Sequence, residues 1–367
     1  MTAGPARSGL RRGRGVLEVP GVALGHAWHT GAGRLTGTTV IVPPPGSTAA
    51  VDVRGGGPAT HETDALAPGT LVDGADAIVL TGGSAFGLAT AHGVQLGLRA
   101  DGRGFPAPGL PGVTVPIVPA AGIFDLGRGG EPCAPPDEAD GHAAYRDART
   151  DQPHLRGSLG AGTGAWTGRG LVRGGLGQAV VTTPSGRTVA ALAVANPMGG
   201  VLDPAGRLHA ASVLAVHGIE VPPAASAPRA GAQGSGTAAP GPADSARNTT
   251  IACIVTDVGL DPARTARLAQ SAHAGLARAI HPSHTLFDGD TVFAVATGER
   301  REAIVDPLVL VELGVAAADA LSAAIVDAVL CAEPDPVPGR VTAAGVPAPP
   351  ALVESTPDTA RAWRALA

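Results

Sequence analysis

The stretch Asn248-Thr249-Thr250-Ile251-Ala252-Cys253-Ile254-Val255-Thr256-Asp257 decides how this chain is organised. Its β-branched residues favour a strand that begins at Thr249. The residues before it, 221–248, are rich in Pro, Gly, Ala and Ser and predict a disordered linker. Thr249 therefore lies where a linker meets a rigid element, and a cut there would expose a Thr with a free α-amine. Such an amine can serve as the base for its own hydroxyl.

The composition excludes several classes of protein. The chain has 367 residues and is 44% hydrophobic but 2% aromatic, so its core must be built from small and medium aliphatic side chains. It contains no Lys, and its net charge of −5 lacks the excess of basic residues that is typical of nucleic-acid-binding proteins. No signal peptide or membrane span is predicted, so the cytoplasm is the expected compartment. The three cysteines are widely spaced and predict neither disulfides nor a zinc site, and Cys253 and Cys331 fit small buried hydrophobes.

Shifts in composition divide the chain into segments. Residues 1–14 predict a disordered tail with a solvated cluster of Arg11, Arg12 and Arg14. Residues 15–220 and 249–335 are expected to form two parts of one domain on either side of the linker. Residues 336–367 are then a C-terminal extension.

The apolar patterns predict strands and helices in mixed order. The clearest helices are 261–280, with Asp261 as its cap and Pro262 in its first turn, and 309–331, which is apolar on nearly all sides. Strands before and after helices, without strict alternation, indicate a layered α+β domain in which helices cover a pair of sheets. The strands are expected at 37–43, 49–54, 75–81, 113–119, 175–182, 187–195, 249–257 and 291–297.

A glycine turn follows the strand at 75–81, in the sequence Gly82-Gly83-Ser84-Ala85-Phe86-Gly87. It lacks the Gly-Lys-Ser/Thr of a phosphate loop, and Phe86 stands where a nucleophile elbow needs Gly. We interpret it as a tight turn with Ser84 capping the next helix. The alternative is a wall of the binding site.

Two acidic residues follow Thr249 at a distance that a strand–helix–loop–strand layout can close. Asp288 and Asp290 lie in a loop just before the strand at 291–297, so that loop can return beside Thr249. One carboxylate can then orient the Thr hydroxyl or amine, and the pair can tune their pKa values. Taken alone, Asp288-Gly289-Asp290 is also ordinary turn chemistry.

Several long motifs together resemble the DmpA-type self-cleaving N-terminal-nucleophile hydrolases. The resemblance covers roughly residues 15 to 335. It rests on motifs that occur in the family's order: Val51-Asp52-Val53-Arg54-Gly55-Gly56, Leu80-Thr81-Gly82-Gly83-Ser84-Ala85-Phe86-Gly87-Leu88, Val115-Pro116-Ile117-Val118-Pro119, Gly160-Ala161-Gly162-Thr163-Gly164-Ala165, Asn248-Thr249-Thr250-Ile251 and His284-Thr285-Leu286-Phe287-Asp288-Gly289-Asp290-Thr291-Val292-Phe293.

The resemblance implies an αββα sandwich of the DmpA/ornithine acetyltransferase type. It also implies autocleavage between Asn248 and Thr249, no cofactor, and a homotetramer of the cleaved units. Thr249 matches the nucleophile, Asp288 and Asp290 match the residues that assist it, and Asn196 matches the Asn that stabilises the oxyanion. Thr with two Asp residues is most similar to the branch that hydrolyses 6-aminohexanoate (nylon) oligomers internally.

The sequence departs from the family pattern at three places. Arg169 stands where a Lys is expected, which keeps the charge but not the capacity to act as a neutral base. Pro197 follows Asn196 and favours extended backbone there. Gly122 stands where aminopeptidase relatives have an acid that binds the free amine of the substrate, which favours internal amide hydrolysis. Arg169, Phe124, Gly83 and Ser84 are expected to shape the substrate pocket.

Three functions stay open. The first is an N-terminal-threonine amidohydrolase of small peptides or oligoamides. The second is an aminopeptidase, or an esterase and amidase for D-residues, with the same fold. The third is an acyltransferase like the ornithine acetyltransferases. No metal site is expected, because His281 and His284 lack a third ligand, and no nucleic acid or membrane partner is expected.

Overall fold

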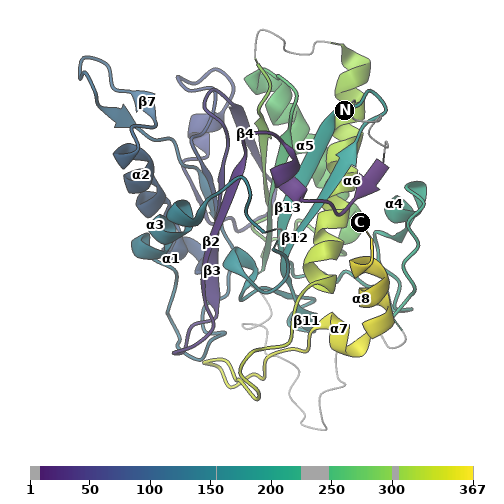
Figure 1. Ribbon diagram of the computed structural model, residues 1–367. Helices are drawn as coiled ribbons and strands as arrows, with labels where there is room; N and C mark the ends of the chain where they lie inside the picture. The colour runs from purple at the N-terminus through teal and green to yellow at the C-terminus, as the bar shows by residue number, and fades with distance from the viewer. Residues whose placement is uncertain (1–8, 154, 225–247, 300–305, 367) are drawn as a thin grey trace.

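The protein is a sandwich of two sheets with helices on both outer faces, as Figure 1 shows. A computed structural model describes residues 9–153, 155–224, 248–299 and 306–366. From one side to the other, the layers are α2 with α3, the sheet of β2 and β3, the sheet of β12 and β13, and α5 with α6. The αββα sandwich is the predicted architecture.

The larger sheet has six strands in the order β1-β12-β13-β14-β15-β4. The strands β14 and β15 are parallel, and the other neighbours pair antiparallel. Their side chains are buried almost throughout, which explains why their sequences are continuous apolar runs. The bounds are β1 Gly9–Arg11, β12 Gly175–Thr182, β13 Thr188–Asn196, β14 Thr249–Thr256, β15 Thr291–Ala296 and β4 Thr48–Val53.

The smaller sheet has five strands in the order β2-β3-β6-β9-β5. Two separate hairpins, β7 with β8 and β10 with β11, lie outside both sheets. Residues 113–119, predicted as one strand, form only the short β8, since the prolines at 116 and 119 interrupt the ladder. The bounds are β2 Ala23–His29, β3 Thr36–Val42, β5 Thr60–His61, β6 Ile78–Thr81, β7 Phe105–Pro106, β8 Thr114–Val115, β9 Ala120–Gly122, β10 Trp166–Thr167 and β11 Val172–Arg173.

Four helices cover the sheets. α5 (Pro262–Ala279) and α6 (Pro307–Leu330) pack on the larger sheet, and α2 (Thr90–Ala100) and α3 (Glu138–Asp147) pack on the smaller one. Apolar clusters fill the space between the sheets and the space under each helix pair. The shorter helices are α1 Ser84–Gly87, α4 Ala211–Val216, α7 Leu352–Ser355 and α8 Pro357–Arg364, with 3-10 turns at Gly15–Glu18, Asp64–Leu66 and Gly160–Gly162.

The predicted helices at 261–280 and 309–331 correspond to α5 and α6. The Asp261 carboxylate caps α5 by accepting from Arg264 N at 2.8 Å. Within the described ranges, α6 is the one helix with the length and apolar composition of a membrane span, and 67% of that apolar window is buried inside the protein. Packing against the sheet and α5 therefore accounts for its hydrophobicity, as its sequence predicts.

The predicted disordered tail, 1–14, and the predicted linker, 221–248, each include residues that are ordered in the structure. Residues 9–11 form β1 and pair with β12, and Arg12 Nε donates to Asp327 Oδ1 at 2.9 Å. The tail is ordered there because a buried carboxylate on α6 binds a residue of the expected solvated cluster. At the other boundary, Ala224 is buried and donates its N–H to Gly206 O. The remainder of the predicted linker, 225–247, lies outside the described residues, as do residues 1–8.

Candidate active site

The sheet topology places Thr249 beside Asn196 and the acidic loop. The antiparallel register of β13 and β14 sets Asn196 opposite Thr249, at the last and first residue of the two strands. Pro197 ends β13 directly after Asn196 and leaves this pairing intact. Because β15 runs parallel to β14, the loop that precedes β15 reaches the same edge of the sheet as Thr249. That loop contains Asp288 and Asp290.

The Thr249 hydroxyl lies against the peptide bond that precedes it. Thr249 Oγ1 donates to Asn248 O at 2.5 Å, and both groups are buried. Gly289 N lies 3.1 Å from Thr249 Oγ1 and 3.2 Å from Asn248 O, so its N–H is shared between the two oxygens. The hydroxyl, the carbonyl of the expected cut and a backbone donor therefore meet at one point.

Asp288 fixes the loop next to this junction. Its Oδ1 accepts from Met198 N at 3.1 Å, and its Oδ2 accepts from Thr285 N and Thr285 Oγ1 at 3.1 and 2.5 Å. The backbone of Asp288 forms a bridge with Asn248. Burial raises the pKa of Asp288, and the negative charge of Asp290 raises it further. The two carboxylates are thus electrostatically linked, and their effect on the Thr249 hydroxyl and amine stays a prediction.

Asp290 binds the backbone at the start of β14. Its Oδ1 accepts from Thr250 N at 2.8 Å, and its Oδ2 accepts from His284 N at 2.9 Å and lies 2.8 Å from His284 Nδ1. The His284 ring in turn meets His273 edge-on. Burial lowers the pKa of His273 to about 4, so this ring is neutral at neutral pH. In the uncut chain neither carboxylate bonds to the Thr249 hydroxyl, because Asn248 O and Gly289 N are its partners.

The Asn196 side chain is fully buried and hydrogen-bonded on both sides. Its Oδ1 accepts from Arg128 Nη1 at 2.5 Å and from Trp166 N at 3.0 Å. Its Nδ2 donates to Phe124 O at 3.3 Å, which leaves one amide hydrogen for another acceptor. Asn196 therefore lies opposite Thr249 with its amide oxygen occupied, and its role at the oxyanion stays a prediction.

Phe124, Gly83 and Ser84 connect to the same site through backbone contacts. Asp125 follows Phe124, is buried, and accepts from Gly83 N at 2.7 Å. Ser84 N donates to Ile123 O. The prediction that Ser84 caps a helix is wrong, because Gly83 is the cap residue in a left-handed conformation and Ser84 is the first residue of α1, without a side-chain cap. The Gly82–Gly87 turn packs next to residues 122–125 through these two bonds. Its role as a wall of the binding site stays a prediction.

Arg169 differs from the other predicted pocket residues. It lies exposed at the tip of the β10–β11 hairpin with a φ of +60°, and it makes no hydrogen bond or ion pair with any residue that the structure describes. The hairpin itself lies near the site, since Gly168 N donates to Gly199 O. The buried arginine of this hairpin is Arg173, whose Nη2 donates to Thr163 O at 2.9 Å. A role for Arg169 with substrate stays a prediction.

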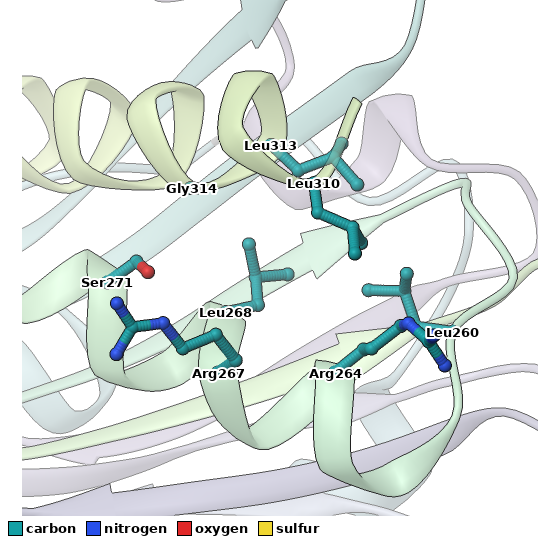
Figure 2. Close-up of a pocket in the computed structure, with 8 residues that line it drawn as sticks. All are labelled: Leu260, Arg264, Arg267, Leu268, Ser271, Leu310, Leu313 and Gly314. Carbon is teal, nitrogen blue, oxygen red and sulfur yellow. The ribbon is translucent and has the colours of Figure 1, made fainter. Parts of the chain in front are cut away.

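A groove between α5 and α6 lies at the other end of the larger sheet (Figure 2). Leu260 follows the end of β14 opposite to Thr249, and none of the predicted site residues lines the groove. It is lined by Leu260, Arg264, Arg267, Leu268, Ser271, Leu310, Leu313 and Gly314. Among the described residues, no group of His, Cys, Asp and Glu is arranged to hold a metal ion.

This fold and site define the class of protein. The model of the family described as peptidase family S58 matches residues 15–342, and the chain belongs to this family. It is therefore a hydrolase of peptide or amide bonds.

Two groups of relatives share the family. An uncharacterized aminopeptidase of Mycobacterium tuberculosis is 41% identical over 335 residues, which cover 87% of this chain and 94% of the relative. The 6-aminohexanoate-oligomer endohydrolase of Paenarthrobacter ureafaciens is 34% identical over 311 residues, which cover 80% of this chain and 78% of the relative.

Solved structures confirm the fold class. The β-aminopeptidase of Burkholderia sp. superposes with a TM-score of 0.69 at 24% identity, over 99% of this chain and 96% of that one. The L-aminopeptidase D-Ala-esterase/amidase of Ochrobactrum anthropi, described as a variant of the Ntn hydrolase fold, gives 0.63 at 22% identity, over 90% and 89%. The predicted α+β fold of an N-terminal-nucleophile hydrolase is confirmed.

Sequence reasoning missed four residues of the site. Gly289 acts through its backbone N–H, which no side-chain pattern reveals. Arg128 lies in the loop Leu126-Gly127-Arg128-Gly129-Gly130, which resembles ordinary turn sequence. Trp166 contributes a backbone donor. His284 is considered from the sequence only as a metal ligand, although its position six residues before Asp290 places it in the same loop.

Proposed function

We propose that this protein is an N-terminal-threonine amidohydrolase that matures by cutting its own chain between Asn248 and Thr249. The observation that supports this most directly is the 2.5 Å contact between Thr249 Oγ1 and Asn248 O, with Gly289 N–H shared between them. The nucleophile, the bond to be cut and a donor for the developing negative charge are then neighbours before any cut occurs.

The cut proceeds in two balanced steps. Thr249 Oγ attacks the Asn248 carbonyl carbon, the C–N bond breaks, and the hydroxyl proton passes to the departing nitrogen, which becomes the α-amine of Thr249. The resulting ester is hydrolysed by water, which leaves a carboxylate on Asn248 and restores the hydroxyl. Gly289 N–H donates to the oxygen of the tetrahedral intermediate in the first step.

In the cut protein the α-amine of Thr249 takes the proton from Oγ as the hydroxyl attacks a substrate amide. The reference pKa of an α-amine is about 7.7–8.0, so a substantial fraction is neutral near pH 8. Asp288 and Asp290 position the two backbone segments that meet at Thr249. Asn196 donates its free amide hydrogen to the oxyanion of the substrate.

The proposed substrates are amides of short peptides or oligoamides, including 6-aminohexanoate oligomers, without a required free N-terminus. A Cβ at position 122 would lie 2.7 Å from Ser84 O, so an acidic side chain does not fit there without a backbone shift. The mycobacterial relative is named an aminopeptidase, which favours an aminopeptidase as the second candidate. We further propose a cytoplasmic location and self-association of the cut units.

Paired substrates separate these candidates. An amidohydrolase of the first kind should cleave an oligoamide and its N-acetylated form with kcat/KM values within about tenfold of each other, because no charged contact to the amine is lost. An aminopeptidase should lose most activity on acetylation. Turnover that requires an added amine acceptor would instead indicate the acyltransferase.

The cut is tested by intact-mass measurement of the purified protein beside two variants. The wild type should appear as two chains that separate between residues 248 and 249. Thr249→Ala should stay whole, because it lacks the hydroxyl. Thr250→Ala is the matched control, since the Thr250 hydroxyl is also buried on β14 but makes no hydrogen bond to a described residue. It should cut as the wild type does.

A Thr249→Ala protein that still separates at this bond would show that another group performs the cut, and the proposal would fail at its first step. A whole wild-type chain would have the same consequence for the maturation. Thr249→Ser, which keeps a hydroxyl, should cut and hydrolyse amides at a measurable rate.

A further inference from the structure

A buried arginine touches the Asn196 amide. Arg128 comes from the loop after β9, and 8% of its surface is exposed. Its Nη1 donates to Asn196 Oδ1 at 2.5 Å and to Gly164 O at 2.6 Å. Its guanidinium carbon lies 4.6 Å from the centre of the Trp166 ring, so the cation lies over an aromatic face.

These contacts decide which way the Asn196 amide points. A carboxamide has similar shapes in its two flipped forms, and its neighbours select one of them. Both groups next to Oδ1, the Arg128 guanidinium and Trp166 N–H, are donors only, so the amide oxygen must face them. The NH₂ group is then turned toward Phe124 O and retains one free hydrogen.

We propose that Arg128 is a positioning residue of the active site, which orients and polarises the Asn196 amide as a donor to the oxyanion. This inference rests on the proposed function. A positive charge against Oδ1 draws electron density from the amide and strengthens its remaining N–H as a donor. One nitrogen of the guanidinium, Nη1, binds both Asn196 and Gly164, and the cation also lies over the Trp166 ring. A flexible Lys ammonium does not reproduce this set of contacts.

Arg128 stays cationic at neutral pH although burial and a neighbouring charge lower its pKa. Burial lowers the pKa of Arg128 to about 10, the carboxylate of Asp125 opposes this effect, and the charge of Arg173 adds to it. The guanidinium therefore stays protonated at neutral pH. Arg173 is buried in the same corner but donates to Thr163 O and Asp335, not to Asn196.

The test compares Arg128→Met, Arg128→Lys and the matched control Arg173→Met. We measure kcat and KM on one amide substrate, the cut fraction by intact mass at fixed times, and the melting temperature of each variant. Arg128→Met should lower kcat by about 10- to 100-fold with KM within about 3-fold, because a misoriented donor is lost mainly in the transition state. Arg128→Lys should recover part of that loss. Arg173→Met should lower the melting temperature but leave kcat within about 3-fold of wild type.

Three outcomes overturn the positioning role. The first is a kcat of Arg128→Met within about 3-fold of wild type, and the second is an equal loss in Arg173→Met. If Arg128→Met does not fold, Arg128→Lys is measured in its place. The third outcome is then a kcat of Arg128→Lys equal to that of wild type. A folded Arg128→Met that is cut as the wild type is, but has the lowered kcat, supports it. Failure of the proposed function is distinct, since it appears as an uncut or inactive wild type.

Discussion

At the scale of single residues, the acid beside the site is the most unusual group. Asp125 is fully buried, and its Oδ2 has no hydrogen-bond partner among the described residues apart from the Thr36 hydroxyl beside it. Burial raises its pKa to about 6 from an ordinary value of 3.8, against the opposing effects of Gly83 N–H, Thr36 and Arg128. The folded protein therefore prefers the protonated form of this carboxyl.

This preference makes stability depend on pH in a defined direction. Below about pH 4 both states hold the proton, so Asp125 costs nothing. As the pH rises from about 4 through about 6, the unfolded state releases the proton before the folded state does. The free energy of unfolding therefore falls by up to about 3 kcal/mol because of this group. Asp125→Asn removes that loss and keeps an acceptor for Gly83 N.

We expect the free energy of unfolding of Asp125→Asn, minus that of wild type, to increase by about 1–3 kcal/mol between pH 4 and pH 7. Denaturant titrations at several pH values measure this difference, and all other titrating groups cancel in it. A difference that is flat with pH, or that falls, contradicts the raised pKa.

At the scale of elements, α6 is the helix to which both ends of the chain are bound. Its Asp327 is fully buried and accepts from Arg12 Nε at 2.9 Å, Trp363 Nε1 at 2.8 Å and Gln178 N at 2.9 Å. Arg156 Nε lies 2.6 Å from the same carboxylate. One side chain thus joins the N-terminal segment, β12 and α8 to the last turn of α6.

Loss of this charge should destabilise the whole fold. Asp327→Asn removes the carboxylate that two partly buried guanidinium groups share, and we expect a loss of about 3–5 kcal/mol in the free energy of unfolding. Asp358→Asn, which removes a carboxylate from the exposed pair with Arg361 on α8, should change it by less than about 0.5 kcal/mol. Equal effects of the two variants would contradict a central role for Asp327.

At the scale of the whole molecule, the strand order decides whether the two fragments would stay together after the proposed cut. Strands β14 and β15 follow Thr249 in the chain, yet they lie inside the larger sheet between β13 and β4, which precede the cut. Both edges of the β14–β15 pair are hydrogen-bonded to the other fragment. The apolar cluster between the two sheets also takes residues from both fragments.

The two fragments of the cut protein should therefore stay together as one folded body. Size-exclusion chromatography in native buffer should give one peak that contains both chains, and denaturing electrophoresis should separate them. Fluorescence and circular dichroism should report coincident unfolding transitions. Elution of the shorter fragment alone in native buffer would contradict this arrangement.

The sequence by itself determined the elements that depend on local forces. The bounds of β12 match the predicted 175–182, and α5 and α6 begin and end within two residues of prediction, because apolar periodicity, caps and proline positions act over a few residues. Family resemblance further supplied Thr249, Asn196, Asp288 and Asp290 as site residues, and the structure gathers them at one edge of the sheet.

Only the tertiary structure decided which distant groups surround those residues. Arg128 bonds to Asn196 across 68 positions of sequence, and Arg12 bonds to Asp327 across 315. Such contacts depend on the order of strands and the packing of layers, which no local pattern encodes. The Gly289 N–H, the exposure of Arg169 and the burial of Arg173 likewise follow from backbone path rather than residue type. The chemistry at Thr249 was thus indicated by sequence, and its supporting contacts were set by the fold.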